Sequence, residues 1–575
     1  MSLLERIFPA ATWMRSYERS NARADISAGL TTAVMLIPQG MAYAMLAGLP
    51  PIIGLYASTI PIILYALFGS SRELAVGPVA MVSLLVATAL TPLAEAGSAE
   101  YVGYAVMLSL LVGVMQAGMG LLRAGFLVNF LSHPVVSGFT SAAALIIGLS
   151  QLKHLLGVDI PRSHHIHTIV IAAVERAGEI QPYTLAIGAV SIAALVILKK
   201  RAPKLPRALI VVGGTTLAVW AFDLASKGVA IVGEVPAGLP TPSMPSLDID
   251  TLTQLAPTAV IISLVGFMES VSVAKAFASK KRYEIQPNQE LVGLGVANLG
   301  AAVFSGYPVT GGFSRTAVNA QAGARTPMAG IVTAVVVIGT LLFLTPLFYY
   351  LPKAVLAAVI MTAVFGLIDV HEVKHLWKID RTDLVLLLLT FGGTLTLGIE
   401  AGIGLGVGAS LLWFVVQTTR PHAVELGRLP GTTAYRNIER HPEAERFPGV
   451  LVLRIDASFY FGNVTFLKEL VRDAMARQET PVHTVILDAS SVNRLDSSAN
   501  GALGEIAQSL EEADVRFILA GLKGPVIDAL QKNGIYQAVA GETPHLSVHD
   551  AVEGTLFSPP PGGETEPKSL LRTAS

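Results

Sequence analysis

The chain has 575 residues, of which 52% are hydrophobic and only 14% are charged, and its mean hydropathy is +0.59. Ordinary soluble domains carry roughly 25% charged residues, so this composition indicates a polytopic membrane protein. The net charge of -1 gives no basis for nucleic-acid binding, and the lack of cysteine excludes disulfides, thiolate metal sites and cysteine catalysis.

The first half of the hydrophobic region follows a mixed segment. Residues 1–24 combine Leu, Ile, Phe and Trp with Arg and Glu, which predicts a cytosolic segment lying on the membrane surface, with a disordered tail as the alternative. No charged residue occurs from Ile26 to Ser71, so two spans of about 20 residues fit there, near 25–45 and 51–69. A short helix near 78–91 follows Gly77-Pro78, and longer spans are expected near 101–124, 134–156, 182–199 and 206–224. The more polar residues 157–181 and 225–254 are expected to form external loops.

The second half repeats this pattern. Spans are expected near 255–278, 289–306, 312–322, 328–349, 353–370, 383–399 and 401–418. The sequence therefore predicts an α-helical polytopic membrane protein with 14 transmembrane segments in a 7+7 inverted repeat, within a transport domain covering residues 25–420. The third member of each half is short and begins with Gly and Pro, which is typical of the binding site in inverted-repeat transporters. Since seven is odd, the two short helices should enter from opposite sides and point their N-termini at each other.

The distribution of Lys and Arg predicts the orientation. Segments around Arg72, Lys199 to Lys204, Lys280 to Arg282 and Lys374 to Arg381 are rich in basic residues and fall on one side. Because basic loops stay in the cytoplasm, both termini are expected to be cytoplasmic and the protein to lie in the cell (inner) membrane.

The composition changes after Arg420-Pro421. Segments 450–455, 483–487 and 515–520 are typical of strands, and 463–477, 498–512 and 524–533 are typical of amphipathic helices. This alternation predicts a small cytosolic α/β domain, placed at residues 432–557, and a polar, Pro- and Gly-rich disordered tail at 558–575.

The segment from Tyr307 to Val318 indicates what the membrane domain binds. Pro308, Gly311 and Gly312 break the chain at membrane depth, and Arg315 lies in the first turn of the helix that follows. A broken helix survives there only where protein or water covers its free backbone groups, and its N-terminus favours anions. The stretch Gly77-Pro78-Val79-Ala80 is its symmetry mate, without a charge. The sequence thus predicts an anion site made by two short helices and one guanidinium.

Two further spans carry candidate residues. Glu269 is a buried acidic residue of the kind that is usually functional in membranes, with Gly266 and Ser272 on the same face. Burial favours its protonated form and a nearby cation its ionised form, so Glu269 could take up a proton when an anion arrives; a static ion pair with Arg315 is the alternative. In the corresponding first-half span, Pro38 and Gln39 interrupt an apolar run, and Gln39 and Tyr43 could face the same cavity; a proline kink with Gln39 bonded to a neighbouring helix is the alternative.

Several motifs resemble a known family. They are Asp25-x-x-Ala28-Gly29-Leu30, Ile37-Pro38-Gln39-Gly40-Met41-Ala42-Tyr43-Ala44, Leu46-Ala47-Gly48-Leu49-Pro50-Pro51, Gly54-Leu55-Tyr56, Gly69-Ser70-Ser71-Arg72, Asn288-Gln289-Glu290-Leu291 and Ser314-Arg315. Together they resemble the sulfate permease (SulP) family, called solute carrier family 26 in animals. The C-terminal domain resembles a STAS domain (sulfate transporter and anti-sigma factor antagonist).

This resemblance implies a core and a gate subdomain, with the anion between the third and tenth helices. It implies a homodimer and elevator-like alternating access. Substrate contacts would come from Gln39, Tyr43, Gly77, Pro78, Val79, Ala80, Phe313, Ser314 and Arg315. Glu269 matches an acidic position linked to proton symport, and Ser497, in Leu495-Asp496-Ser497-Ser498-Ala499, matches a phospho-acceptor position, although capping of the helix is the more ordinary role for a serine there.

We therefore expect secondary active transport of an anion of the sulfate, dicarboxylate or bicarbonate class by proton symport. No enzyme activity, metal or cofactor is expected. A sodium-coupled bicarbonate transporter or an anion exchanger is the near alternative. A membrane-anchored signalling or scaffold protein, whose STAS domain contacts a cytosolic partner, is the alternative of another class.

Overall fold

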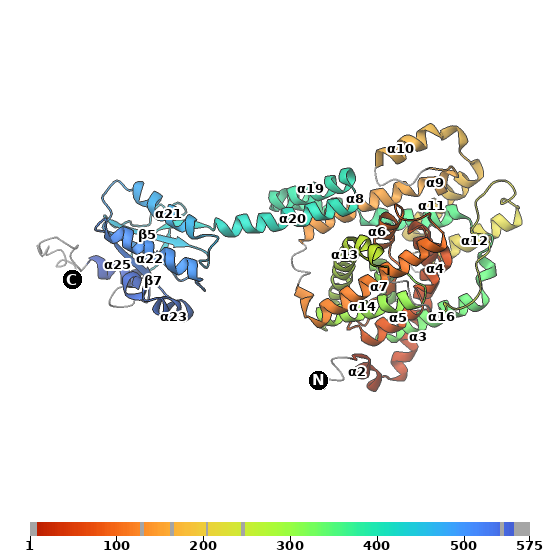
Figure 1. Cartoon of the computed structure of the whole chain (residues 1–575), viewed down its shortest axis with the longest axis horizontal. Helices are drawn as coiled ribbons and strands as arrows, with labels where there is room; N and C mark the ends of the chain where they lie inside the picture. Colours follow the sequence, from red (N-terminus) through yellow and green to blue (C-terminus); the bar gives the residue numbers. More distant parts are fainter. Residues whose placement is uncertain are drawn as a thin grey trace, which may run out of the picture. The chain divides into compact units, whose positions relative to one another are not determined.

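The computed structural model describes residues 8–126, 132–160, 166–202, 205–242, 248–540 and 545–556. The chain divides into two compact units, Met1–Ser410 and Leu411–Ser575, each with its own hydrophobic core (Figure 1). The predicted tail at 558–575 and the first seven residues of the predicted surface segment lie outside the described residues.

The helices of the first half follow the predicted order, with two differences. They are α2 (Ala10–Arg15), α3 (Arg19–Leu46), α4 (Pro51–Tyr56), α5 (Ile60–Phe68), α6 (Ala80–Leu90), α7 (Ala99–Leu121), α8 (His133–Ser150), α9 (Leu152–Leu156), α10 (Ile166–Glu175), the 3-10 turn η2 (Ala177–Glu179), α11 (Pro182–Arg201) and α12 (Arg207–Ala221). The span expected at 51–69 corresponds to the apolar segment Pro51–Phe68, which is interrupted between α4 and α5 because Pro61 in the first turn of α5 has no N–H to continue the preceding helix. The loop expected at 157–181 contains α10, since Ile169 packs on Val158 and Ile160.

The second half has the same arrangement. It comprises α13 (Ile249–Lys281), α14 (Pro287–Val303), α15 (Phe313–Gln321), α16 (Met328–Phe343), η3 (Thr345–Phe348), α17 (Lys353–Val364), η4 (Phe365–Leu367), α18 (Val370–Ile379), α19 (Arg381–Leu397) and α20 (Ile399–Thr419). Among the described residues, 8 helical segments are long and apolar enough to cross a membrane, and α6, α12 and α16 are shorter apolar helices. This order is consistent with two corresponding halves, each with a short helix third, although length alone does not reproduce the count of 14.

The membrane helices pack in two groups. In one group α14 packs against α5 and α7, α13 against α7, and α16 against α3 and α5. In the other, α8 packs against α19, and α11 against α17 and α12. Glycine permits the closest approaches in the first group: a Cβ on Gly54 would lie 2.0 Å from the carbonyl oxygen of Gly40, and one on Gly295 would lie 2.4 Å from the amide nitrogen of Ala117. A Cβ on Gly138 of α8 would likewise lie 2.3 Å from the carbonyl oxygen of Leu387 on α19, so close helix contacts occur in both groups, and the first group is the one that carries the predicted anion site.

The C-terminal unit is a five-stranded sheet covered by helices. The strands β3 (Ala423–Arg428), β4 (Tyr435–Asn437), β5 (Val450–Ile455), β6 (Thr484–Asp488) and β7 (Arg516–Ala520) lie in the order β4-β3-β5-β6-β7, with β5, β6 and β7 parallel and β3 antiparallel to its neighbours. The helices are α21 (Val464–Ala476), α22 (Ser497–Glu511), α23 (Gly524–Lys532), α24 (Tyr536–Ala540) and α25 (Val548–Leu556).

Strand alternation divides the core of this unit. Leu451, Leu453 and Ile455 face α21 and α22, whereas Val452 faces α25, as the two-residue period of a strand requires. The predicted strands correspond to β5, β6 and β7, and the predicted helices to α21, α22 and α23. Strand β3 was not predicted, and it precedes residue 432, so the sheet begins before the expected start of the domain.

Candidate functional site

A two-stranded ladder joins the two chain breaks that the sequence singles out. Strand β1 (Val76–Gly77) pairs antiparallel with β2 (Thr310–Gly311), with Val76 opposite Gly311 and Gly77 opposite Thr310. The amide of Gly312 extends the ladder by donating to the carbonyl of Ala75 at 3.1 Å. Helices α6 and α15 begin directly after these strands. The stretch beginning at Gly77-Pro78 and the stretch ending at Ser314 therefore lie side by side, although more than 230 residues separate them in the chain.

The two helix N-termini at this ladder have no side-chain caps. Val79 precedes α6 and Gly312 precedes α15, and neither provides a side-chain cap hydrogen bond in the described structure. The first N–H groups of an α-helix have no partner within the helix. Both helices thus present backbone donors, with the positive end of the helix dipole, at one place in the membrane unit.

Arg315 adds a full positive charge to these donors. Its side chain is 2% exposed and donates from Nη1 to the carbonyl of Pro78 across the ladder. Nε and Nη2 are buried and have no hydrogen-bond partner among the described residues. A buried guanidinium with two unused nitrogens is costly unless an acceptor satisfies it. The site is therefore short of acceptors, and an anion would supply them.

Glycines make room for this guanidinium. A Cβ on Gly312 would lie 3.0 Å from Nη2 of Arg315 and 3.2 Å from Cζ. Gly77 has a φ of +151°, and its Cβ would lie 3.4 Å from Nη2. The glycines that break the two spans are thus also the positions where a side chain would press on Arg315.

A chain of hydroxyl groups fixes the ladder to α13. Ser270 Oγ accepts from the amide of Gly311 at 2.8 Å and lies 2.7 Å from Thr310 Oγ1, which donates to the carbonyl of Gly266 at 2.7 Å. Because the Thr310 proton goes to Gly266, the Ser270 proton must go to Thr310, so every hydrogen bond in the chain has a defined direction. Asn298 of α14 holds Val309, the residue before Thr310: its side chain accepts from the amide of Val309 at 2.8 Å and donates to the carbonyl of Val309 at 3.0 Å.

The other predicted residues lie on the helices that surround α15. Gln39 and Tyr43 of α3 are 3% and 5% exposed, and Gln39 Oε1 is buried without a partner in the described structure. Val79 and Ala80 are buried, whereas Phe313 and Ser314 are exposed at the start of α15. Helices α3 and α13 both pack against α15 and α6. The structure therefore gathers the predicted substrate residues around one ladder.

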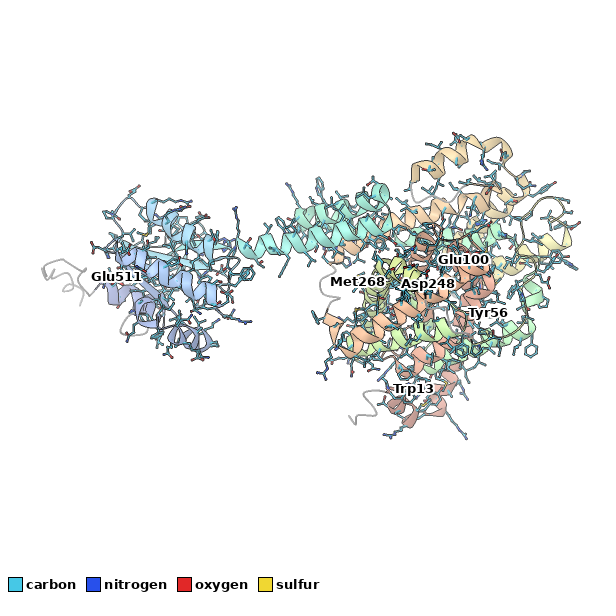
Figure 2. The ribbon with its side chains drawn as sticks, viewed as in Figure 1. Trp13, Tyr56, Glu100, Asp248, Met268 and Glu511 are labelled. Atoms are coloured by element: carbon cyan, nitrogen blue, oxygen red, sulfur yellow. The ribbon has the colours of Figure 1, made fainter. Side chains whose placement is uncertain are left out.

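Glu269 lies on the adjoining turn of α13. Figure 2 shows Met268, the residue before it, within the body of the membrane unit. Glu269 is partly buried, and its charge interacts with that of Arg315. The unused nitrogens of Arg315 do not donate to Glu269, and no ion pair joins the two side chains among the described residues, so the alternative of a static ion pair finds no support there. The sequence analysis did not assign a role to Ser270, Thr310 or Asn298. A polar residue inside or beside an apolar span can still indicate a functional position, so their residue types could have identified them.

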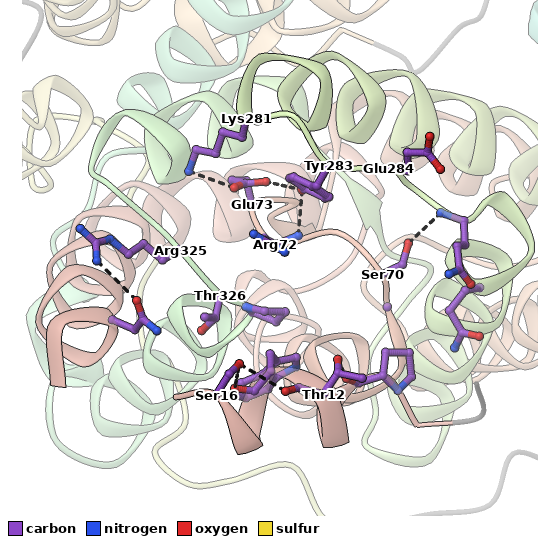
Figure 3. A pocket seen from close by; sticks show the side chains of 17 residues that line it. Thr12, Ser16, Ser70, Arg72, Glu73, Lys281, Tyr283, Glu284, Arg325 and Thr326 are labelled. Carbon is purple, nitrogen blue, oxygen red and sulfur yellow. Dashed lines mark hydrogen bonds and ion pairs between the residues drawn. The ribbon is translucent and has the colours of Figure 1, made fainter. Parts of the chain in front are cut away.

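The membrane unit also contains a cavity that none of these residues lines. It has a volume of about 750 Å³ and opens between α2 and the loops that follow α5, α13 and α15 (Figure 3). Its lining is polar and includes Arg72, Glu73, Lys281, Tyr283 and Arg325. The sequence analysis did not predict this cavity, because these residues come from three separate segments of the chain.

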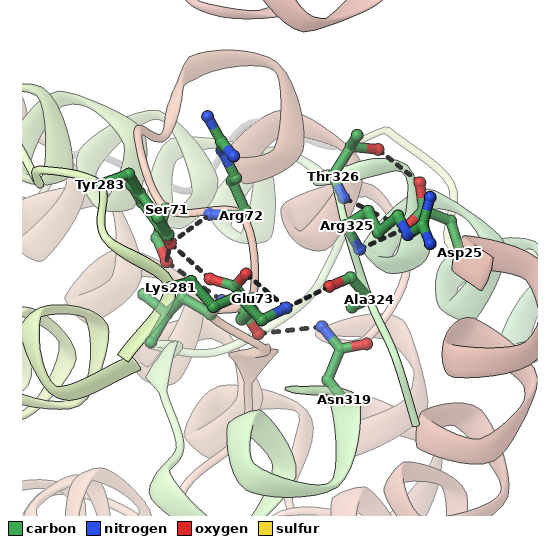
Figure 4. Close-up of polar contacts among 11 residues, drawn as sticks. Asp25, Ser71, Arg72, Glu73, Lys281, Tyr283, Asn319, Ala324, Arg325 and Thr326 are labelled. Carbon is green, nitrogen blue, oxygen red and sulfur yellow. Dashed lines mark hydrogen bonds and ion pairs between the residues drawn. The ribbon is translucent and has the colours of Figure 1, made fainter. Parts of the chain in front are cut away.

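Three buried carboxylates tie together the segments around this cavity. Asp25 accepts from the amides of Arg325 and Thr326 at 2.8 and 3.1 Å (Figure 4). Glu290 accepts from Tyr65, Ser70 and the amide of Ser71 at 2.6–2.9 Å. Asp25, Glu290 and the third carboxylate, Glu73, are each 0% exposed. The oxygens of Asp25 and Glu290 accept hydrogen bonds from segments that are distant in the chain, so these two carboxylates have a structural role.

Glu73 is the third carboxylate, and it closes the network. It forms an ion pair with Lys281 at 2.9 Å and accepts from the hydroxyl of Tyr283. Burial and the neighbouring Glu73 raise the pKa of Tyr283 well above its usual range, so this phenol stays protonated and donates. The side chain of Asn319, on α15, donates to the carbonyl of Glu73 at 2.9 Å. The loop beside the cavity is thereby bonded to the helix that carries Arg315.

Ser497 does not have the ordinary role expected for it. Helix α22 is capped by Asp496, whose Oδ1 accepts from the amide of Ala499 at 2.8 Å, while Oδ2 accepts from the amide of Phe461 at 2.8 Å. Ser497 is the first helical residue and is exposed. The expectation that Ser497 caps the helix was wrong, because the carboxylate one residue earlier already takes that position.

Comparisons with known proteins agree with this architecture. The sulfate permease family matches residues 23–390, and the STAS domain matches residues 441–551. The chain is 42% identical over 572 residues to "Sulfate transporter 4.1, chloroplastic" of Arabidopsis thaliana, covering 96% of this chain and 83% of that protein. It is 36% identical over 570 residues to "High affinity sulfate transporter 2" of Stylosanthes hamata, covering 96% of this chain and 86% of that protein.

A solved structure shows the same overall fold. The murine Solute Carrier 26 family member A9 anion transporter, in the inward-facing state, superposes with a TM-score of 0.89 at 26% identity, over 96% of this chain and 94% of that chain. The matched region includes both the membrane helices and the STAS domain. From its membrane helices, its C-terminal domain and these matches, the chain belongs to the sulfate permease (SulP/SLC26) family.

Proposed function

We propose that this protein is a secondary active transporter that binds an anion at the β1–β2 ladder and carries it across the cell (inner) membrane together with a proton. The observation that carries the proposal is the convergence of two uncapped helix N-termini on a buried Arg315 whose Nε and Nη2 lack acceptors. A tetrahedral or planar oxyanion has enough acceptor sites to use all of these donors at once.

Proton coupling would follow from the charge balance of the occupied site. A dianion beside one guanidinium leaves net negative charge in a place shielded from water, and an ionised Glu269 would add to it. Since like charges disfavour each other, arrival of the anion favours the protonated form of Glu269. Anion and proton then bind together and leave together, which is the requirement for symport.

Alternating access would use the two packing groups of membrane helices. The ladder, Arg315 and Glu269 all belong to the group built from α3, α13, α14 and α16, and the hydroxyl chain through Ser270 fixes the ladder to α13. A site held this firmly favours movement of the whole group against the group built from α8, α11, α17 and α19. This is an elevator-like movement of a core against a gate, rather than a local rearrangement of the site.

Sulfate is the first substrate to test. Two relatives that align over most of their length are described as sulfate transporters, at 42% and 36% identity. Dicarboxylates and bicarbonate have suitable chemistry too, and sodium-coupled bicarbonate transport or anion exchange is the near alternative. A homodimer with cytoplasmic termini, a cytosolic partner for the STAS domain and, as a separate element, regulation at Ser497 complete the proposal.

The test is uptake into proteoliposomes that contain the purified full chain. We expect saturable accumulation of radiolabelled sulfate that follows an inward proton gradient and ignores a sodium gradient. The Glu269→Gln variant should transport without dependence on the proton gradient, whereas Glu284→Gln, an exposed control outside the spans, should behave as the unmodified protein. Sulfate accumulation driven by sodium would favour the bicarbonate-type alternative, and absence of accumulation of any of the three anions would favour a signalling or scaffold role.

A further inference from the structure

Two connections between the packing groups of membrane helices lie side by side. One leads from α12, which packs on α11, to α13, which packs on α7. The other leads from α16, which packs on α3 and α5, to α17, which packs on α11. Residues 230–233 of the first connection run antiparallel to residues 349–353 of the second, with Ile231 opposite Pro352. A segment that passes from one group to the other is therefore paired with a segment that returns.

Backbone hydrogen bonds alone make this pairing, which we call the strap (residues 230–233 and 349–353). Three amides donate to carbonyls across it: Val232 to Leu351 at 2.8 Å, Lys353 to Ala230 at 2.9 Å and Gly233 to Tyr349 at 3.1 Å. The first two bonds flank the pair of Ile231 and Pro352, which therefore occupies a non-hydrogen-bonded position of an antiparallel ladder. Proline fits there because its missing N–H has no bond to make.

The first connection is also bonded to both packing groups beyond the strap. On one side Gln181, which precedes α11, donates from Nε2 to the carbonyl of Lys227 at 2.6 Å. On the other side the amide of Gly238 donates to the carbonyl of Leu341 on α16 at 3.1 Å. Leu351 is 0% exposed and belongs to the hydrophobic core of the membrane unit. The strap is thus fixed to each group and packed on the core.

Glycines lie on both sides of the strap. Gly228 has a φ of +92° and Gly238 a φ of +129°, which are values that residues with a Cβ rarely adopt. Hinges in proteins are formed by a few loop residues that absorb changes in φ and ψ at the ends of stiffer elements. A paired segment between two glycine joints has this arrangement.

We infer that the strap is a hinge about which the two packing groups rotate, and that its backbone pairing persists throughout transport. This inference rests on the proposed function and adds where the movement is anchored. Opening the strap would break three hydrogen bonds and uncover Leu351, whereas rotation at the glycines breaks none of these bonds. Since α16 ends at the strap and α17 begins there, the relative displacement of these two helices should increase with distance from it.

A disulfide across the strap tests whether the pairing persists. The chain has no cysteine, so the double variant Ile231→Cys with Pro352→Cys contains a single pair. In a non-hydrogen-bonded pair the Cα atoms lie about 4.5 Å apart, which is within the range that a disulfide spans. Uptake is measured in proteoliposomes with whichever of sulfate, a dicarboxylate or bicarbonate the unmodified protein accumulates. The oxidised and reduced forms should transport at the same rate, and Ile231→Cys alone controls for the oxidant.

A proline substitution tests whether the pairing is needed. Val232→Pro removes the amide that donates to Leu351 and should lower the maximal uptake rate several-fold without changing the Kd of the anion. Adding the cysteine pair to this variant should restore the rate on oxidation only, which a general loss of stability would not do. Glu234→Pro is the matched control, at an exposed position whose amide has no partner among the described residues. Stabilisation by the anion shows that each variant is folded.

Amide hydrogen exchange tests the pairing without transport. The amides of Val232, Gly233 and Lys353 should exchange more slowly than that of Glu234, and equally slowly with and without the anion. Absence of uptake by the unmodified protein would count against the proposed function alone, and exchange at these amides would still decide whether the strap stays paired. Three results would each overturn the inference: loss of uptake when the cysteine pair is oxidised, full uptake by Val232→Pro, or faster exchange at Val232 when the anion is added.

Discussion

Replacing Arg315 by methionine should make the empty protein more stable and its anion binding much weaker. Methionine fills a similar elongated space without charge. In the unmodified protein the guanidinium is 2% exposed and bonded only to the Pro78 carbonyl. Replacing even a paired buried charge by apolar groups of similar volume is often neutral or stabilises a protein by about 1–4 kcal/mol, and Arg315 has no ion-pair partner among the described residues to offset its burial. Loss of the hydrogen bond to Pro78 offsets about 1 kcal/mol of this gain, which leaves a net stabilisation.

The effect on binding has the opposite sign. Two hydrogen bonds from a charged donor to the anion would be lost, and each contributes roughly 1.5–3 kcal/mol. Even the loss of about 2–3 kcal/mol raises Kd roughly 30- to 150-fold. Arg315→Lys should give an intermediate Kd, because it keeps the charge but not the planar pair of donors. A functional role for Arg315 thus predicts that stability and affinity move in opposite directions.

Thermal unfolding in detergent, with and without sulfate, measures both quantities on the same sample. Leu341→Ala, at a 0% exposed position of α16, is the control for an ordinary core change: it should lower the melting temperature and leave the sulfate Kd unaltered. A lower melting temperature for Arg315→Met, combined with an unchanged sulfate Kd, would refute the reasoning, since Arg315 would then be a structural residue.

Three further variants test the surroundings of the site and the C-terminal unit. Gly312→Ala places a Cβ 3.0 Å from Nη2 of Arg315 and should weaken anion binding about tenfold if the guanidinium is displaced by a fraction of an ångström, whereas Gly339→Ala, where a Cβ meets nothing within 4 Å, should not change binding. Ser270→Ala leaves the amide of Gly311 without its acceptor and should raise the KM for uptake, with rescue by Ser270→Thr; an unaltered KM would show that the hydroxyl chain does not position the ladder. Asp496→Ala removes the cap of α22 and should lower stability of its first turn by about 1 kcal/mol, visible as faster amide hydrogen exchange at Ala499, while Ser497→Ala should leave that exchange unchanged.

The order of the membrane helices could be predicted from the sequence because it depends on local properties. Long uncharged runs mark spans, and Gly-Pro or Gly-Gly pairs mark the short helices α6 and α15. Interruptions inside apolar runs were harder to predict: the break between α4 and α5 depends on Pro61, but proline occurs within α3 and α13 without ending either helix. Whether a proline ends or only bends a helix is decided by the neighbours that satisfy the freed carbonyl, and those are not adjacent in sequence.

The polar networks could not be predicted for the same reason. Asp25, Glu73 and Glu290 are each conspicuous as acidic residues beside apolar segments, but their partners lie between 200 and 300 residues away in the chain. Strand β3 was missed because Ala423–Arg428 has polar and apolar residues on both faces of a short segment next to a membrane helix. In each case the residue types were visible in the sequence, and only the fold specified what they contact.

The β1–β2 ladder is the feature of the structure that follows most directly from the breaks seen in the sequence. Backbone at membrane depth that is neither helix nor closed barrel must have its N–H and C=O groups satisfied by protein. Two breaks at corresponding positions of an inverted repeat can satisfy each other, and Val76–Gly77 with Thr310–Gly311 do so by pairing. The pairing of β1 with β2 also brings the N-termini of α6 and α15 together. The excess of N–H donors at that place therefore results from the pairing itself. Satisfying the broken backbone and gathering donors beside Arg315 thus have one structural origin in this protein, and the proposed anion site adds only one guanidinium to them.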